Sequence, residues 1–150
     1  MIFLDNSQSN NCSDVMIQGS FSREYVYGPT KVCSVLARSV DVGLSHCVAI
    51  SDCGSKVYTW GRGSECQLGI GLTKGNAIPQ TVETLNGMYE QSSAGFYHTA
   101  VLSDEGVVFV WGKGMASVLK RGGQLSGLDP TVMLPTQHMM FVLVWWSSIF

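Results

Sequence analysis

Charge is scarce in this chain, and the residue spacings of common metal and nucleotide sites are missing. Charged residues make up 13% of its 150 residues, and the formal net charge is −2. Proteins that bind nucleic acid normally need a basic surplus. We therefore expect no direct contact with DNA or RNA.

The five cysteines include no C-x-x-C pair, and their number is odd. This excludes the common zinc spacings and argues against a complete disulfide framework. The first ten residues, MIFLDNSQSN, have neither the basic flank nor the apolar run of a secretory signal. We interpret the cysteines as reduced thiols and predict an intracellular protein, cytoplasmic or nuclear.

Long apolar runs are missing as well. The stretch Met139 to Phe150 is the most apolar, but as a helix it would span about 18 Å, against ~30 Å for a bilayer core. No transmembrane segment is therefore predicted. The glycine triplets at 61–63 and 112–114 complete no phosphate-binding motif, and no Ser-His-Asp or Cys-His arrangement has supporting context. We predict no enzyme activity, no cofactor and no metal.

What the chain does contain is an internal repeat. Residues 43–54 (GLSHCVAISDCG) realign with 95–106 (GFYHTAVLSDEG), and residues 57–63 (VYTWGRG) realign with 108–114 (VFVWGKG). Nine of these nineteen aligned positions are identical, where ordinary composition gives about one. A repeat of this length is typical of stacked or radially arranged units that bury their apolar faces on one another.

Each copy predicts a β-hairpin. Residues 45–51 and 56–60 favour strands, and Ser51-Asp52-Cys53-Gly54 between them has turn chemistry. In the second copy the strands are expected at 97–103 and 107–111, on either side of a turn at 104–106. The first copy has one extra residue after the turn, which predicts a bulge. Because no segment shows a sustained helical period, we predict an all-β chain.

The spacing of the prolines locates an insertion. Pro29, Pro79 and Pro135 lie 50 and 56 residues apart, and the distance to the next Gln-Leu grows from 7 residues after Trp60 to 13 after Trp111. Six residues are therefore inserted within 113–123. Insertions in repeat proteins map to loops that often bind partners, so this segment is either a contact patch or a drifted loop. The candidate contact residues are Lys113, Met115, Val118, Leu119, Lys120 and Arg121.

The recurring histidines and aspartates allow a catalytic and a structural interpretation. His46 and His98 have the chemistry of bases or metal ligands, and Asp52 and Asp104 that of a carboxylate pair. A catalytic residue need not recur in every unit, whereas packing and turn residues do. We therefore assign the histidines to packing or a backbone hydrogen bond, the aspartates to turns, and the recurring tryptophans to packing.

Together these residues resemble the repeat family named for the regulator of chromosome condensation. Its repeat looks like G-x-x-H, an apolar run, D-x-G, V-Y-x-W-G, then G-Q-L-G and a later proline. Ser126 departs from this pattern, because a glycine should follow Gln124-Leu125. The matching structural positions are Gly43, His46, Asp52, Gly54, Trp60, Gly61, Gln67, Leu68, Gly69, Gly95, His98, Asp104, Gly106, Trp111 and Gly112.

The resemblance implies a β-propeller of four-stranded blades, typically seven in this family. Because 150 residues are too few for that number, we expect a fragment: a partial β-propeller of about two to three antiparallel blades that does not close a ring. We divide the chain into a polar leader with unassigned strands (1–28), the repeats (29–138), and an apolar tail or start of the next blade (139–150). Within the repeats, 29–42 is the tail of a preceding blade, 43–94 the first repeat and 95–138 the second.

Function is implied by the resemblance alone. Such propellers are rigid, their loop faces bind proteins, and family members often act on small GTPases or scaffold larger assemblies. The resemblance therefore implies a non-enzymatic protein-interaction module, with guanine-nucleotide exchange on a small GTPase as one candidate role. Two alternatives are the propeller part of a ubiquitin-ligase- or kinase-associated scaffold, and a truncated fragment without a role of its own. Further blades, or self-association, would complete a ring.

Overall fold

The computed structural model describes residues 2–5, 13–21, 24–113 and 131–138, with side chains described over 35–113 and at Pro135. The described residues form strands and loops without a helix, so the all-β prediction is confirmed. None of them forms a helix that could cross a bilayer. The strands are β1 (Ile2–Asp5), β2 (Ser13–Phe21), β3 (Glu24–Val42), β4 (His46–Ser51), β5 (Val57–Gly61), β6 (Asn76–Thr81), β7 (Tyr89–Ala94), β8 (His98–Ser103), β9 (Val108–Lys113) and β10 (Thr131–His138).

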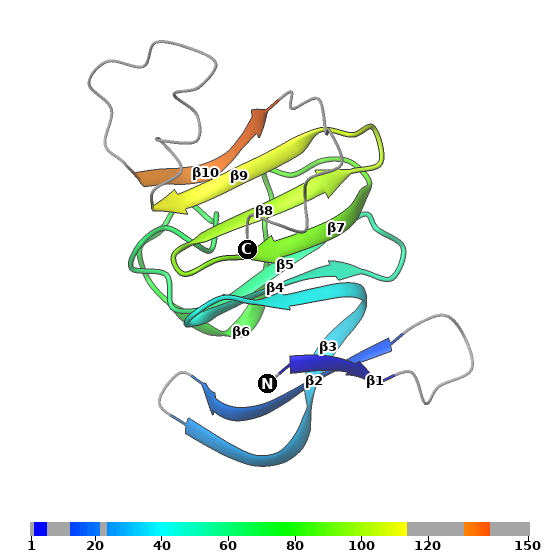
Figure 1. Cartoon of the computed structure of the whole chain (residues 1–150), viewed down its shortest axis with the longest axis vertical. Helices are drawn as coiled ribbons and strands as arrows, with labels where there is room; N and C mark the ends of the chain where they lie inside the picture. Colours follow the sequence, from blue (N-terminus) through cyan, green and yellow to red (C-terminus); the bar gives the residue numbers. More distant parts are fainter. Residues whose placement is uncertain (1, 6–12, 22–23, 114–130, 139–150) are drawn as a thin grey trace.

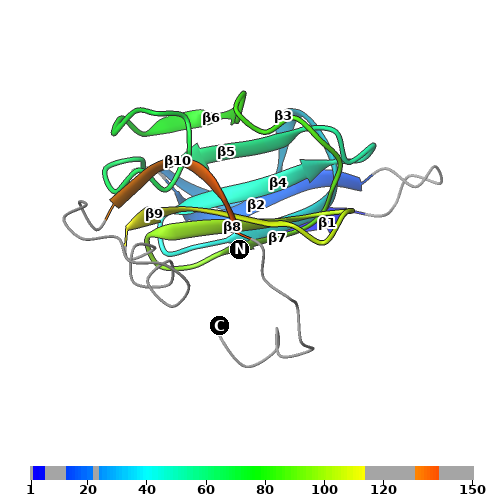
Figure 2. The same cartoon turned by 90° about the horizontal axis from the view of Figure 1, so that it is seen from above.

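The strands form two antiparallel sheets in which neighbours along the chain are also neighbours in space. One sheet has the order β1-β2-β3-β4-β5-β6 and the other the order β10-β9-β8-β7. Figures 1 and 2 show the four strands β7 to β10 lying as a layer against β4 and β5. This sequential antiparallel order is the meander of a propeller blade, and it occurs in both sheets. The described sheets do not close a ring.

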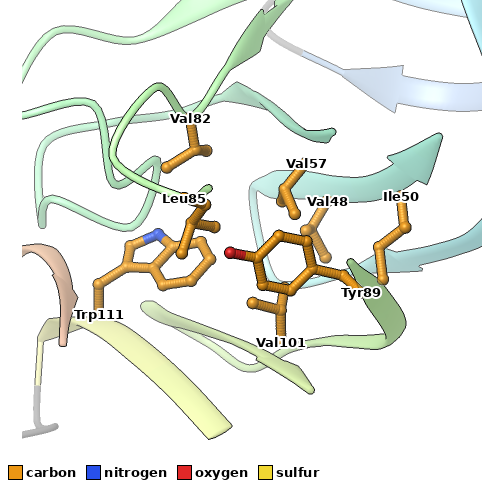
Figure 3. Close-up of a cluster of buried hydrophobic side chains, with 8 residues drawn as sticks. All are labelled: Val48, Ile50, Val57, Val82, Leu85, Tyr89, Val101 and Trp111. Carbon is orange, nitrogen blue, oxygen red and sulfur yellow. The ribbon is translucent and has the colours of Figure 1, made fainter. Parts of the chain in front are cut away.

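The main core lies between the two sheets (Figure 3). Val48 and Ile50 of β4 meet Tyr89 of β7 and Trp111 of β9, and each of these side chains is at most 1% exposed. All six residues of β4 are buried, because both faces of this strand are covered. That explains its nearly continuous apolar run, where a strand with one wet face would alternate.

The two tryptophans hold equivalent places. Trp60 pairs with Cys47, and Trp111 pairs with Thr99, the residue of the second copy that is aligned with Cys47. Both indoles are buried, with 1% and 0% exposure. Each projects from the same face of its own sheet, so the repeat in the sequence is also a repeat in the packing.

Both predicted hairpins are present, but the predicted bulge is wrong. The ladder between β4 and β5 runs from His46 to Ile50 without a shift in register. The extra residue lies in the turn instead. Ser51 N donates to Lys56 O in the first copy, whereas Ser103 N donates to Val107 O in the second, one residue sooner.

The prolines occupy equivalent positions in the outer strands. The residue after Pro79 pairs with Thr59, and the residue after Pro135 pairs with Val110, the aligned position of the second copy. The six-residue insertion therefore leaves the register of β10 on β9 intact at this point. The segment from 114 to 130, which contains the insertion, lies outside the described residues.

The same register recurs before the first copy. The residue after Pro29 in β3 pairs with Ile17 of β2, as the residue after Pro79 pairs with Thr59. Val15–Gly19 of β2 thus corresponds to Val57–Gly61 of β5, although the sequence alone showed no match here. The strand β3 continues through Val42 and pairs with β4, which joins this hairpin and the first copy into one sheet. The residue bounds of the repeats stay a prediction.

Candidate functional site

Buried hydrogen bonds join the two sheets at the recurring histidine. His46 Nε2 lies 2.8 Å from Thr99 Oγ1, and this hydroxyl donates to the Gln67 carbonyl over 2.7 Å. The indole Nε1–H of Trp111 donates to the same carbonyl over 2.8 Å. A single carbonyl oxygen in the Gln-Leu-Gly loop of the first copy therefore holds two side chains of the second sheet.

The hydroxyl proton determines the tautomer of His46. Because Thr99 has one hydroxyl proton and donates it to Gln67, the His46 Nε2 must carry a proton and donate to the hydroxyl. Burial lowers the pKa of His46 to about 4, although contact with the His98 backbone acts in the opposite direction. The ring is therefore neutral at pH 7. The sequence predicted packing or a backbone partner, and the structure adds a side-chain hydroxyl 53 positions away.

Glycine permits this close approach of the two sheets. Gly69 has φ +67°, and a Cβ there would lie 2.6 Å from Trp111 Nε1. A Cβ at Gly43 would collide with the Gly95 carbonyl and with the His46 ring. Two glycines of the repeat pattern are thus required where the first sheet touches the second.

The recurring aspartates lie in two equivalent turns. Gly54 N donates to Ser51 O over 2.9 Å, Gly106 N donates to Ser103 O over 3.0 Å, and both glycines have φ +81°. Asp52 and Asp104 occupy the same place in the two turns: Asp52 N donates to Leu36 O of β3, and Asp104 N donates to Met88 O, directly before β7. Among the described residues, no group of three or more His, Cys, Asp or Glu side chains is arranged to hold a metal ion.

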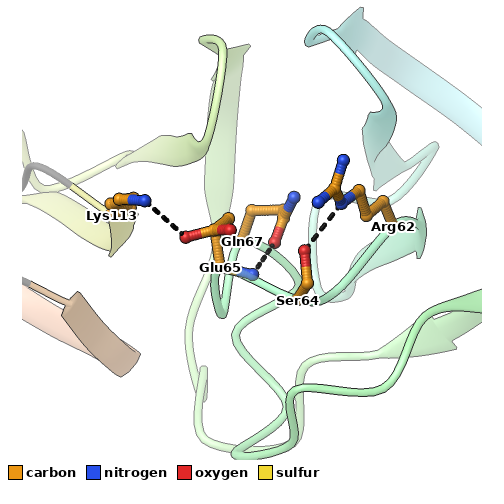
Figure 4. A network of polar contacts seen from close by, with 5 residues as sticks. All are labelled: Arg62, Ser64, Glu65, Gln67 and Lys113. Atoms are coloured by element: carbon orange, nitrogen blue, oxygen red, sulfur yellow. Dashed lines mark hydrogen bonds and ion pairs between the residues drawn. The ribbon is translucent and has the colours of Figure 1, made fainter.

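At the opposite end from these turns, one ion pair crosses between the sheets beside two hydrogen bonds within the segment after β5 (Figure 4). Lys113 Nζ of β9 lies 3.0 Å from Glu65 Oε2, in the loop after β5. Glu65 N donates to Gln67 Oε1 over 2.8 Å, and Arg62 Nε donates to Ser64 Oγ over 2.6 Å. The Lys113 side chain is 51% exposed, so this ion pair is screened by water and contributes little to stability.

Of the predicted interaction loop, the structure describes Lys113 alone. The other candidates, Met115, Val118, Leu119, Lys120 and Arg121, lie outside the described residues. The same holds for Gln124-Leu125 and for the apolar tail or start of the next blade expected at 139–150.

The structure also shows an apolar patch that the sequence reasoning missed. Leu44 is 58% exposed and Phe96 is 70% exposed, and they occupy the same position of the two G-x-x-H segments. Leu44 N donates to Gly95 O, so the two loops touch. A shallow depression of about 390 Å³ lies between them, lined by Val42, Gly43, Leu44, Ala94, Gly95, Phe96 and His98. The sequence signal that could have found this patch is the large apolar residue directly after the glycine in both copies.

The strands β3 to β6 of the six-stranded sheet and the strands β7 to β10 form two meanders in the same register. They pack face to face, with Trp111 of the second against the Gln67 loop of the first, as neighbouring blades of a β-propeller do. The regulator of chromosome condensation (RCC1) repeat model matches residues 55–102, and a second model of that repeat matches residues 91–114. The chain therefore carries repeats of the RCC1 family over residues 55–114.

Three proteins illustrate the sequence similarity. The chain is 33% identical over 94 residues to the ultraviolet-B receptor UVR8 of Arabidopsis thaliana, covering 62% of this chain and 21% of the receptor. It is 43% identical over 76 residues to the probable E3 ubiquitin-protein ligase HERC6 of Homo sapiens, covering 49% and 7%. It is 31% identical over 97 residues to RCC1 domain-containing protein 1 of Mus musculus, covering 61% and 26%. The chain thus spans about a quarter or less of each relative.

Solved structures share the fold. Prp20p of Saccharomyces cerevisiae, described with its binding to Gsp1p and histones, superposes with a TM-score of 0.66 at 18% identity, over 86% of this chain and 34% of that one. Human WBSCR16 superposes with a TM-score of 0.64 at 24% identity, over 91% and 34%. At these identities the likeness concerns the propeller blades alone.

Proposed function

We propose that this chain is part of a non-enzymatic β-propeller module that binds proteins through the loop end of its blades. The observation that carries the proposal is the contrast between buried and exposed positions of the repeat. Identical residues such as His46 and Trp111 are buried between the sheets, whereas large apolar side chains at variable positions, Leu44 and Phe96, are exposed at the loops. Exposed apolar side chains that gather on a rigid scaffold are typical of protein-binding surfaces.

The proteins that bind a structurally similar propeller are the partners to test first. Prp20p is described with Gsp1p and histones, and it has also been solved with Kap60. We would immobilise the full chain and measure saturable binding of purified small GTPases, core histones and Kap60 by surface plasmon resonance. Binding that an excess of free chain removes supports the interaction module. Absence of saturable binding across the panel would remove these three classes as partners.

Guanine-nucleotide exchange is a finer form of the same proposal. The test is release of a fluorescent GDP from small GTPases of the major subfamilies, with and without the chain. Acceleration that depends on the concentration of the chain supports exchange. Unchanged release rates in every subfamily reject exchange and leave the binding module standing.

We propose the insertion as part of the contact surface. Replacing residues 113–123 by the shorter segment that follows Trp60 would remove Met115, Val118, Leu119, Lys120 and Arg121 together. Because the register of β10 on β9 is kept around the insertion, the shortened chain is expected to fold. Partners that bind the shortened chain with unchanged affinity would reject the loop as a contact.

A ubiquitin-ligase-associated scaffold is the second candidate. The observation in its favour is the 43% identity to HERC6 over 76 residues. The transcript sequence on both sides of this segment provides the test. A catalytic ligase domain in the same reading frame would favour the scaffold, and its absence would favour a separate propeller.

A further inference from the structure

The loop end of the two blades has an apolar centre and a basic surround. We propose that it docks an acidic protein segment that places one large apolar side chain in the depression between Leu44 and Phe96. The inference rests on the proposed binding function and specifies the chemistry of the partner. Four observations carry it: the position of the apolar residues, the position of the basic residues, the state of the acidic residues, and the charge of the far end.

The apolar centre is built by equivalent residues. Leu44 and Phe96 follow the glycine of their own G-x-x-H segment, and the two loops touch through Leu44 N and Gly95 O. Val42 is 40% exposed at the edge of the same depression. The depression is open and shallow, which suits a single side chain of a partner better than an enclosed small molecule.

Basic residues stand beside each apolar residue. Arg62 N donates to Ser45 O, and Lys113 N donates to Tyr97 O, so each blade places a basic residue against the segment that carries its apolar residue. Lys113 Nζ also lies 5.8 Å from the centre of the Tyr97 ring. The chain returns to this end at Lys74, whose carbonyl lies against Gly63.

The acidic side chains at this end are already bonded within the protein. Asp41 accepts the backbone N–H groups of Val42 and Ala94, each over 2.8 Å. Glu65 pairs with Lys113. Among the described residues of this end, the three basic side chains of Arg62, Lys74 and Lys113 stand against two acidic ones, Asp41 and Glu65, which leaves a surplus of one positive charge.

The far end of the blades has the opposite character. Among the described residues, the turns there carry Asp52, Asp104 and Glu105, and Lys56 and Arg38 are basic residues beside them. An acidic segment is thus attracted to the loop end and disfavoured at the turn end. The charge distribution selects both the class of partner and the end of the blade that it contacts.

The test is selection from a random twelve-residue peptide display library on the full chain, followed by fluorescence anisotropy of labelled synthetic peptides. We expect the selected peptides to combine carboxylates with one aromatic or large aliphatic residue. Phe96→Ser and Arg62→Glu should each weaken them at least tenfold. The matched controls, Ile78→Ser and Lys56→Glu, should leave affinity unchanged, because Ile78 is 68% exposed on the outer strand β6 and Lys56 lies at the turn end.

Each other outcome overturns the inference. Peptides that are basic, or that bind Phe96→Ser as tightly as the parent chain, would place the contact elsewhere and leave the binding module intact. A dimer in size-exclusion chromatography that Phe96→Ser converts to a monomer would make a second copy the occupant. If no peptide binds saturably, the acidic segment is rejected, and the binding module is then judged on its protein panel.

Discussion

Replacing Gly69 by alanine should destabilise the chain far more than replacing Gly106, although both glycines have positive φ. Their φ angles are +67° and +81°, so an alanine at either position carries a similar backbone strain. That strain costs roughly 1–2 kcal/mol. The two sites differ in the room that they leave for a new Cβ atom. A Cβ at Gly106 would have no heavy atom within 4 Å, whereas a Cβ at Gly69 would lie 2.6 Å from Trp111 Nε1.

The magnitude follows from what the new methyl group displaces. Trp111 is fully buried and cannot move outward without opening the core between the sheets. Overpacking of this kind costs about 1–3 kcal/mol. Displacing the indole also lengthens the 2.8 Å hydrogen bond from Trp111 to Gln67, which adds about 1 kcal/mol. We therefore expect Gly69→Ala to cost roughly 3–6 kcal/mol and Gly106→Ala roughly 1–2 kcal/mol.

Gly54 provides an internal check, because it is the first-copy equivalent of Gly106. Its φ is also +81°, and a Cβ there would lie 3.0 Å from the Tyr89 carbonyl. Gly54→Ala should fall between the other two variants. Urea unfolding followed by tryptophan fluorescence and circular dichroism gives all three free energies. If Gly69→Ala and Gly106→Ala lose the same stability within error, the close approach at Gly69 is not a constraint.

Three further predictions concern the joint between the sheets and the thiols. Thr99→Val should cost about 1–3 kcal/mol in urea unfolding, because it leaves the His46 Nε2–H without an acceptor, while Thr99→Ser should keep most of the stability; equal losses would contradict this. In the folded chain the pKa of His46 is lowered to about 4, so between pH 6.5 and 4 the unfolded chain protonates this ring and the folded chain does not. The free energy of unfolding should therefore fall by roughly 3 kcal/mol as the pH drops through that window. A slope that survives His46→Gln undiminished would assign it to other groups, among them His98, whose pKa is also lowered by burial. Hydrogen bonds from Ser51, the larger effect, and from Ser55 lower the pKa of the exposed Cys53 thiol to about 7, whereas burial raises the pKa of the Cys47 thiol. Iodoacetamide at pH 7.5 should therefore alkylate Cys53 at least tenfold faster than Cys47, as measured by peptide mass spectrometry. Similar rates for the two thiols would be evidence against these environments.

The hairpins could be predicted because their information is local. Strand-favouring residues on both sides of an Asp-x-Gly turn specify a hairpin, and the repeat spacing then predicts an equivalent hairpin in the second copy. The match at Val15–Gly19 was missed for an equally local reason. Gln18 stands where Trp60 stands in the next unit, so the aromatic signal is absent, and only strand pairing reveals the equivalence.

The contacts between the sheets could not be predicted in the same way. Thr99 bonds to residues 53 and 32 positions earlier, and such distances depend on how the sheets pack. The first copy gives no sign of these hydrogen bonds, because Cys47 stands at the position aligned with Thr99 and has no hydroxyl group. Recurrence indicated that His46 is structural, but it did not indicate its partner. The exposure of Leu44 and Phe96 likewise depends on which loops meet at the end of the blades.

The comparison of the two copies separates architecture from surface chemistry. Positions that are identical in both, such as Gly43 with Gly95 and Trp60 with Trp111, supply backbone approach and buried packing that every blade needs. Leu44 with Phe96 and Arg62 with Lys113 differ in residue but keep their chemical class, and all four lie at the loop end. Blade packing does not require an exposed side chain to be apolar or basic, because water accommodates either. A chemical class kept in both copies at one exposed end therefore supports the docking surface that we propose there.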